Sequence, residues 1–175
     1  MLLFEIHNIA YGWFEVCFLP HSNKACIIEN SDYLNCDAPK LLLGSLADLA
    51  DGVRKEQWLC WQDEPGAHII HLSLSEENIT VGIYSTDKTS KELPYSGDTL
   101  KQEIKECRFC NDFEVSYLID EVLTQFSLYE KGNGLKLYNE HWGKFPQKEY
   151  DRLKIYAERL NQKRDKYDEM FFFSY

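Results

Sequence analysis

The sequence predicts an α+β fold in which an antiparallel β-sheet, built mainly from the N-terminal part, is covered by C-terminal helices. Before residue 100, short segments alternate apolar and polar residues and are separated by turn residues, a pattern typical of strands. After residue 110, apolar residues recur at helical spacing instead. A chain of 175 residues can bury a substantial core, so we predict a single α+β domain over residues 1–175.

Strand patterns fill most of the first half of the chain. Along 11–19, the apolar residues Phe14, Val16 and Phe18 share one face, and the other face carries Trp13, Glu15 and Cys17. Turn residues stand at 20–23 and again at 63–66, where the sequence is Asp-Glu-Pro-Gly. Residues 99–110 fit both a helix and an edge strand, and we expect the strand. The other expected strands are 2–7, 11–19, 24–29, 57–62, 68–75 and 79–85.

One helix is expected among the strands, between Asp37 and Gly52. The Asp37 carboxylate can cap its N-terminus, and Pro39 is tolerated in the first turn. Gly52 supplies the C-terminal stop. The apolar stripe at helical spacing consists of Leu42, Leu43, Leu46, Leu49 and Ala50.

Three further helices are expected after Cys110. Asn111 or Asp112 can cap the first, whose apolar stripe consists of Val115, Leu118, Ile119, Val122, Phe126 and Tyr129. A short helix over 135–142 and a long one from Pro146 follow. Because the apolar positions of the long helix recur up to its end, we expect residues 170–175 to dock on the body of the protein.

The charge is unevenly distributed along the chain. Residues 1–99 hold 15 acidic and 6 basic side chains, whereas residues 100–175 hold 14 and 13, so most of the net charge of −10 belongs to the first part. An acidic surface repels nucleic acid and anionic membranes and attracts basic partners. The N-terminus lacks the basic segment of a secretory signal, and no apolar run reaches the roughly 18 residues of a membrane span. We therefore expect a cytoplasmic protein.

The residues that could carry catalytic or metal chemistry form no strong motif. Cys107 and Cys110 make a C-x-x-C, but no second pair completes a zinc site, so we favour two ordinary reduced cysteines at a strand end. On a strand, His68 and His71 face opposite sides and cannot share one ion. We expect no cofactor and no metal. An alternative of another class remains open: a small cytoplasmic enzyme with a metal or cysteine site.

Three segments carry a resemblance to a known group of proteins. They are Ser-Asp-Tyr-Leu at 31–34 leading into Ala-Pro-Lys-Leu-Leu at 38–42, Glu-Pro-Gly at 64–66 before a hairpin, and Tyr-x-x-x-Trp-x-x-Phe-Pro at 138–146. With its small size and acidity, the chain resembles the bacterial immunity proteins of polymorphic and contact-dependent toxin systems. The resemblance implies a non-catalytic protein that binds and blocks a toxin, and it carries over no defined functional residues.

An acidic inhibitor of this kind would bind a basic toxin domain. Nuclease toxins present basic surfaces to their substrate, and an acidic inhibitor can mimic phosphate charge and associate fast. Acidity that serves solubility alone is the competing interpretation. The acidic residues expected to contact the partner are Asp32, Asp48, Asp51, Glu56, Asp63, Glu64, Glu76 and Glu77.

Overall fold

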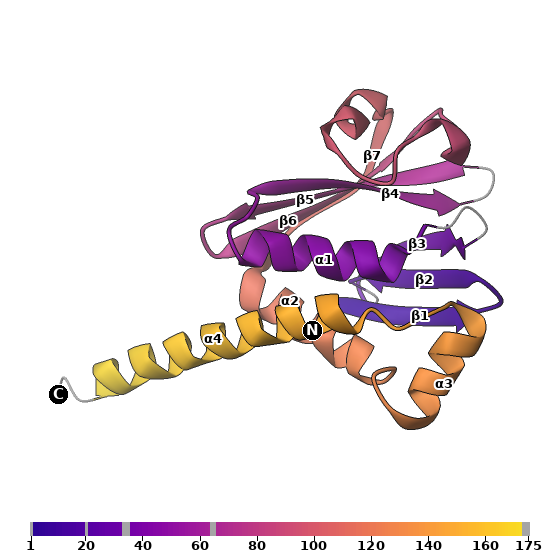
Figure 1. The fold of residues 1–175 in the computed structure, drawn as a ribbon. Helices are drawn as coiled ribbons and strands as arrows, with labels where there is room; N and C mark the ends of the chain where they lie inside the picture. Colours follow the sequence, from indigo (N-terminus) through magenta and orange to yellow (C-terminus); the bar gives the residue numbers. More distant parts are fainter. Residues whose placement is uncertain (1, 20, 33–35, 64–65, 173–175) are drawn as a thin grey trace.

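The protein folds into two antiparallel sheets and a set of helices packed against them (Figure 1). The computed structural model describes residues 2–19, 21–32, 36–63 and 66–172; the side chains of Ser90 and of every residue beyond Asn161 are outside that description. The predicted α+β class is confirmed, with the refinement that the strands form two sheets. Within the described ranges the strands are β1 (Phe4–Ala10), β2 (Trp13–Phe18), β3 (Cys26–Ser31), β4 (Glu56–Asp63), β5 (Gly66–Ser75), β6 (Asn78–Ser85) and β7 (Glu106–Glu114).

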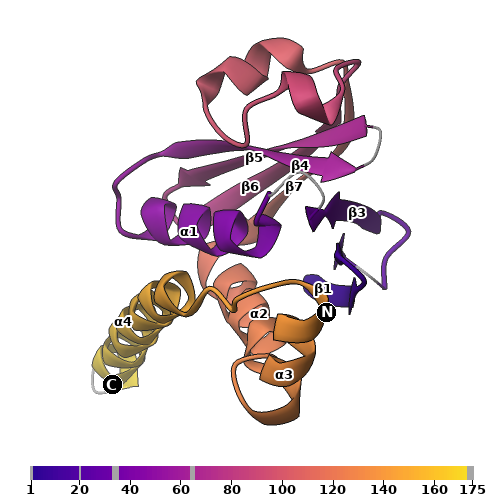
Figure 2. The ribbon, with the colours of Figure 1, turned by 45° about the vertical axis from the view of Figure 1, so that its right-hand side comes forward.

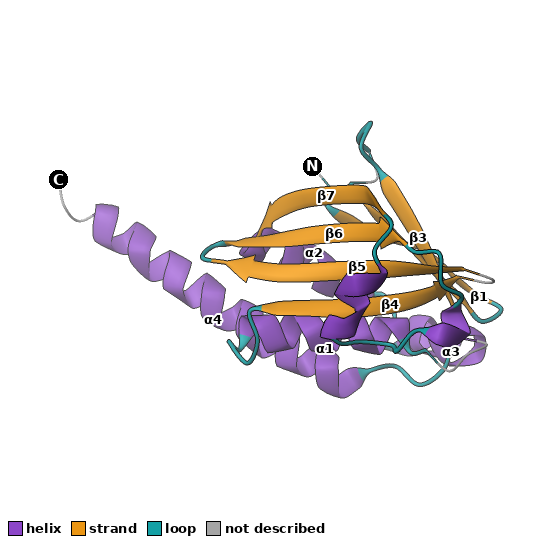
Figure 3. Ribbon diagram, turned by 90° about the horizontal axis from the view of Figure 1, so that it is seen from above, coloured by secondary structure: helices purple, strands orange, loops and turns teal. Residues whose placement is uncertain are grey.

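Both sheets are built by consecutive strands. The first has the order β1-β2-β3, and the second has the order β4-β5-β6-β7, which Figure 3 shows side by side. The β1–β2 connection is the two-residue turn Tyr11–Gly12, in which both residues have positive φ angles of 53° and 79°. Two positive φ angles match the right-handed twist of a hairpin, which is why a glycine stands at the second position.

The helices cover mainly one face of the four-stranded sheet. They are α1 (Ala38–Ala50), α2 (Val115–Ser127), α3 (Gly132–His141) and α4 (Gln147–Phe172). Helices α1 and α2 contact the sheet directly, and α4 packs on both of them (Figure 2). The predicted cap of α1 is confirmed, because the Lys40 N–H donates to Asp37 Oδ1 at 3.2 Å. No described helix is long and apolar enough to cross a membrane.

The main core lies where the first sheet, the second sheet and the helices meet. Phe14 of β2 is fully buried and contacts Trp61 of β4 and Phe126 of α2, with ring centroids 5.7 and 6.1 Å apart. Phe18, also on β2, reaches Phe109 of β7 at 6.0 Å. The even-numbered residues of β2 thus form the buried face that the alternation predicted.

A buried asparagine joins the two sheets. Asn30 of β3 is fully buried, and its Oδ1 accepts a hydrogen bond from the Gln62 N–H of β4 at 2.7 Å. Its Nδ2 donates to the carbonyl oxygens of Ser31 at 3.0 Å and Cys36 at 3.2 Å. These contacts hold the end of β3 against the end of β4.

The strand expected over 99–110 is confirmed only in its second half. Residues Asp98–Glu103 form a short 3-10 helix, and the strand begins only at Glu106. Leu100 is fully buried there, in a small cluster with Trp58 and Ile69 on the face of the second sheet opposite α1. This packing overrides the alternation that favoured a strand.

The capping residue of α2 also differs from the prediction. The strand continues through Asn111 and Asp112, and α2 begins after Glu114. The predicted stripe of α2 is nevertheless buried from Val115 to Phe126. The expected docking of residues 170–175 concerns side chains that lie outside the described residues.

Candidate protein-binding surface

Strand β4 separates the predicted acidic residues into two groups. Glu56 begins this eight-residue strand and Asp63 ends it, so their backbones lie about 23 Å apart at a rise of about 3.3 Å per residue. Asp48, Asp51, Glu76 and Glu77 belong to the Glu56 end, and Asp32 belongs to the Asp63 end. Glu64 lies outside the described residues. The described acids of the predicted interface therefore lie in two groups, one at each end of β4.

In the first group, Asp48 and Asp51 are held by an arginine of α4. Arg152 Nη2 lies 2.9 Å from Asp48 Oδ1 and 3.0 Å from Asp51 Oδ2. The hydrogen bonds that Arg152 donates to Asp51 and Asp48 raise the pKa of its guanidinium. Gln57 Nε2 also donates to Asp48, at 3.3 Å. These two carboxylates join α1 to α4, and the single positive charge of Arg152 offsets part of their negative charge within the protein.

The remaining acids of this group are differently placed. Glu56 Oε2 lies 3.3 Å from His71 Nε2, and the His71 ring stacks on Trp58 at 4.0 Å. Burial lowers the pKa of His71. Glu76 and Glu77 form the exposed turn between β5 and β6, where Glu76 has a positive φ of 51°. Only this turn offers solvent-exposed carboxylates without a described ion pair in the group.

A further group of acidic residues lies on the outer face of the first sheet, and Asp63 is its only member among the acids that the sequence analysis selected. We call this row of Glu5, His7, Glu15, Glu29 and Asp63 the acidic sheet face. It crosses from β1 through β2 and β3 to the end of β4. The antiparallel register sets Glu15 directly opposite Glu29, and it sets Glu5 opposite Cys17.

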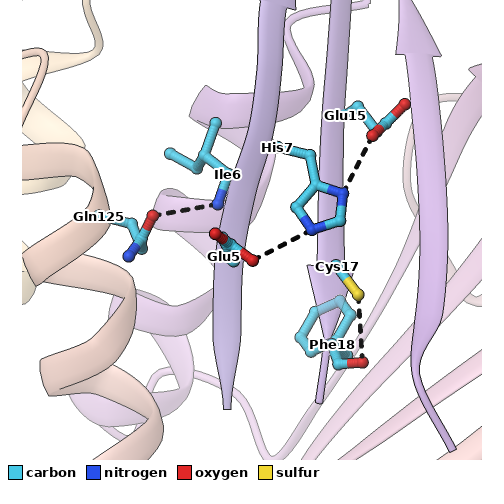
Figure 4. A network of polar contacts seen from close by, with 7 residues as sticks. All are labelled: Glu5, Ile6, His7, Glu15, Cys17, Phe18 and Gln125. Atoms are coloured by element: carbon cyan, nitrogen blue, oxygen red, sulfur yellow. Dashed lines mark hydrogen bonds and ion pairs between the residues drawn. The ribbon is translucent and has the colours of Figure 1, made fainter. Parts of the chain in front are cut away.

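His7 connects the carboxylates of two strands. A bulge between Ile6 and Asn8 leaves His7 without a partner on β2 and turns its ring toward both neighbours. The ring Nε2 lies 3.1 Å from Glu5 Oε2, and Nδ1 lies 3.1 Å from Glu15 Oε1 (Figure 4). Beside the bulge, the Ile6 N–H donates to Gln125 Oε1 of α2 at 3.2 Å, so the helix fixes this edge of the sheet.

The carboxylates of the acidic sheet face repel one another. The pKa of Glu29 is raised by partial burial, then by its hydrogen bond and proximity to Glu15, and finally by the charge of Asp63. Among the described residues, no lysine or arginine forms an ion pair with Glu5, Glu15 or Glu29. Their negative charge is therefore available to a partner, unlike that of Asp48 and Asp51.

Asp63 ends the row next to a buried histidine. His68 Nε2 lies 3.4 Å from Asp63 Oδ2, and Arg108 Nη1 lies 3.4 Å from His68 Nδ1. Burial lowers the pKa of His68 more than Asp63 raises it. The neutral ring thus sits between a carboxylate and a guanidinium, and it brings β7 to the edge of the acidic sheet face.

The other acid of this end, Asp32, lies beside the β1–β2 turn. Its N–H donates to the Gly12 carbonyl at 2.8 Å, and its carboxylate covers Gly12 so closely that a Cβ there would lie 2.4 Å from Oδ1. Asp32 also lines a hollow of about 220 Å³ with Trp142 and Lys144. It is therefore a neighbour of the first sheet's turn rather than a member of the row.

A larger hollow lies between α1, the segment 95–97 and the start of α4. Its volume is about 640 Å³. Both charge signs line it, including Lys40 and Arg54 on one hand and Asp48 and Glu149 on the other. Such a lining shows no preference for a ligand of one charge.

The cysteines do not assemble a metal site in the described part of the chain. There, no group of three His, Cys, Asp or Glu side chains could hold a metal ion. Burial raises the pKa of Cys36 and of Cys60 to about 12. Cys107 and Cys110 are exposed, but they lie inside β7 rather than at its end as expected.

Comparisons with known proteins give no relative to this chain. No protein-family model, no curated protein and no solved structure matches it. The function must be inferred from the chain itself.

Proposed function

We propose that this protein is a non-catalytic acidic binding protein that neutralises a basic toxin domain, in the manner of a bacterial immunity protein, and that the acidic sheet face is its binding surface. The observation that supports the proposal most strongly is the pairing of β2 with β3, which sets Glu15 directly opposite Glu29. Burial, and after it the neighbouring Glu15 carboxylate, raises the pKa of Glu29. Carboxylates that repel each other gain stability when a cationic partner approaches. A lysine or arginine of the partner would supply the missing positive charge.

Apolar side chains near the row add contact area. Ile27 faces outward on β3, opposite Cys17, and is 50% exposed. Tyr11 at the tip of the β1–β2 hairpin is 89% exposed, and its ring lies in a T-shaped arrangement with the His141 ring, with centroids 5.5 Å apart. Interfaces combine such anchors with a charged surround, the anchors giving affinity and the charges giving orientation.

The mechanism of such an inhibitor is competition for a basic surface. A row of carboxylates steers a basic domain toward the first sheet and then occupies the surface that would bind nucleic acid. The net charge of −10 disfavours binding of nucleic acid by this protein itself. As part of the proposal, we place the protein in the cytoplasm, where its six cysteines stay reduced.

The test compares two charge reversals of equal size. The first is the pair Glu15→Lys and Glu29→Lys in the acidic sheet face; the matched control is the pair Glu76→Lys and Glu77→Lys in the exposed turn of β5 and β6. As the partner, the experiment uses the product of the gene directly upstream of this one, with any catalytic activity removed by mutation. Association is measured by stopped flow over a salt series.

We expect the first pair to slow association by about tenfold or more at low salt, because charges at an interface act mainly on the on-rate. The control pair should leave the rate nearly unchanged. Equal slowing by both pairs would show that net charge, not this surface, governs binding. No effect of the first pair would contradict the proposal.

A further inference from the structure

The hollow between α1, the segment 95–97 and the start of α4 forms a groove along one face of α1. The residues of α1 that line it begin at the N-cap Asp37, end at Asp48 and recur once per helical turn. Helix α4 borders the groove where it begins, beneath α1 in Figure 1. From Asp37 to Asp48 the helix rises about 16 Å, the length of about five residues of extended chain. The volume of about 640 Å³ lies within the range of ligand sites, about 300 to 1,000 Å³.

A glycine in the middle of α1 keeps the groove open. Gly44 lines the hollow, although glycine inside a helix lowers stability relative to alanine. Packing does not require it, because a Cβ at Gly44 would meet only Glu149 Cγ, at the ordinary contact distance of 3.6 Å. The missing side chain therefore leaves space in the groove that a larger residue would fill.

Two buried polar side chains line the same groove. Gln57 is 8% exposed, and its Nε2 donates to Asp48 Oδ2 at 3.3 Å. Ser45 is 7% exposed, and its hydroxyl makes no hydrogen bond with any described residue. Because buried hydroxyl groups nearly always have a partner, Ser45 offers a donor and an acceptor to a molecule in the groove.

The charges that line the groove are equal in number, but not all of them are paired. Arg152 is bound to Asp48, whereas Arg54 and Glu149 form no ion pair with a described residue. The Arg54 N–H donates to the Asp48 carbonyl at 3.3 Å, at the end of α1, and Glu149 lies about one turn earlier, beside Gly44. The groove thus presents one free guanidinium and one free carboxylate, anchored about 6 Å apart along α1.

The other end of the groove strengthens its negative side. Burial raises the pKa of Asp37, the hydrogen bond and charge of Lys40 oppose that rise, and the charge of Glu149 adds to it. Asp37 and Glu149 are therefore close enough to repel each other, and Lys40 offsets Asp37. A cationic group that enters beside Glu149 would relieve this repulsion.

We propose that the groove binds a short peptide of about two to four residues with both termini free. Arg54 binds the terminal carboxylate, Glu149 binds the terminal ammonium group, and the Ser45 hydroxyl bonds a backbone amide between them. A ligand of one charge sign would leave one of the two groups unpaired, whereas a zwitterion pairs both. A free amino acid is too short, because its two charges share one Cα. None of these residues belongs to the acidic sheet face, so this inference does not depend on the proposed binding function.

The test titrates the full-length protein with trialanine in a calorimeter at low salt. The matched ligands are N-acetyl-trialanine, which lacks the ammonium group, and trialanine amide, which lacks the carboxylate. We expect trialanine to bind, and each blocked peptide to bind about fivefold more weakly, as for the loss of one exposed ion pair. Free alanine should bind more weakly than trialanine.

Two charge variants assign each terminus to its residue. Arg54→Met should weaken trialanine binding and abolish the preference over the amide, but keep the preference over the acetylated peptide. Glu149→Gln should do the reverse. The controls Arg159→Met and Glu158→Gln change exposed residues of α4 outside the groove and should bind as the parent does.

Filling the groove tests its geometry. Gly44→Leu should abolish binding; if this variant does not fold, the two charge variants make the test alone. Failure of the parent to bind trialanine, or equal binding of the free and blocked peptides, would overturn the proposal. So would free alanine binding as tightly as trialanine, or a folded Gly44→Leu variant that binds as the parent does.

Discussion

Asn30 is the buried side chain whose loss should most clearly separate the two sheets, and we predict the effect of Asn30→Ala. The parent side chain makes three hydrogen bonds at 2.7 to 3.2 Å, all in a fully buried position. Each such bond contributes about 1 kcal/mol net to stability. The predicted loss is about 3 kcal/mol, since alanine leaves all three backbone partners without this amide.

Urea denaturation measures this loss. With an m-value of about 2 kcal/mol/M, the midpoint should fall by about 1.5 M. In a thermal melt, a chain of this size should lose about 6 to 12 °C. The control is Asn111→Ala, which removes an exposed amide bonded to the Asp112 carbonyl at 3.0 Å and should change stability by less than about 0.5 kcal/mol. A loss below about 1 kcal/mol for Asn30→Ala, or equal losses for both variants, would refute the reasoning.

Three further outcomes are expected. The pKa of Glu29 is higher in the folded than in the unfolded state, so ionisation of Glu29 lowers the stability of the fold as the pH rises above the unfolded-state pKa. The variant Glu29→Gln should therefore have a higher melting temperature than the parent at about pH 7 and the same melting temperature at about pH 3.5. A difference in melting temperature that does not change with pH would contradict this. Arg152→Met should lower the free energy of unfolding in urea by less than about 1 kcal/mol, and by less at high salt, because the ion pair of Arg152 with Asp48 is partly exposed. A loss above about 2 kcal/mol would show that the packing of α4 depends on this ion pair. In the reduced folded protein, the exposed Cys107 and Cys110 should react fast with a thiol reagent, and the buried Cys36 should react only after unfolding. Elemental analysis of the purified protein should find no stoichiometric zinc. Bound zinc would favour the alternative of an enzyme with a metal site.

The features that the sequence predicted correctly are local. The helix after Asp37 depends on a cap three residues from its partner and on an apolar stripe within thirteen residues. Each strand from β1 to β6 was likewise visible in its own alternation. Interactions within one element do not require knowledge of the neighbours, so the sequence contains enough information to place them.

The candidate site depends on register and could not be predicted in the same way. The alternation placed Glu15 on the outer face of its strand, but only the pairing of β2 with β3 sets Glu29 opposite it. The contact of β3 with β4 through Asn30 then brings Asp63 close. Conversely, the α4 residue that neutralises Asp48 is 104 residues away in sequence, so counting acids along the chain overestimated how many are free.

The two β-bulges in β1 and β7 both lie in edge strands. β1 and β7 are each the last strand of a sheet, and bulges at such positions re-aim side chains and hinder edge-to-edge aggregation. In β1 the extra residue His7 joins two carboxylates. In β7 the extra residue Arg108 leaves Cys107 opposite Tyr84 and Cys110 opposite Gly82, so the two cysteines share one face. A motif search assumes that spacing along the strand fixes the face on which a side chain lies. One inserted residue breaks that assumption. Regular alternation would place Cys107 and Cys110 on opposite faces of the sheet, but the register of β7 puts both on the same face.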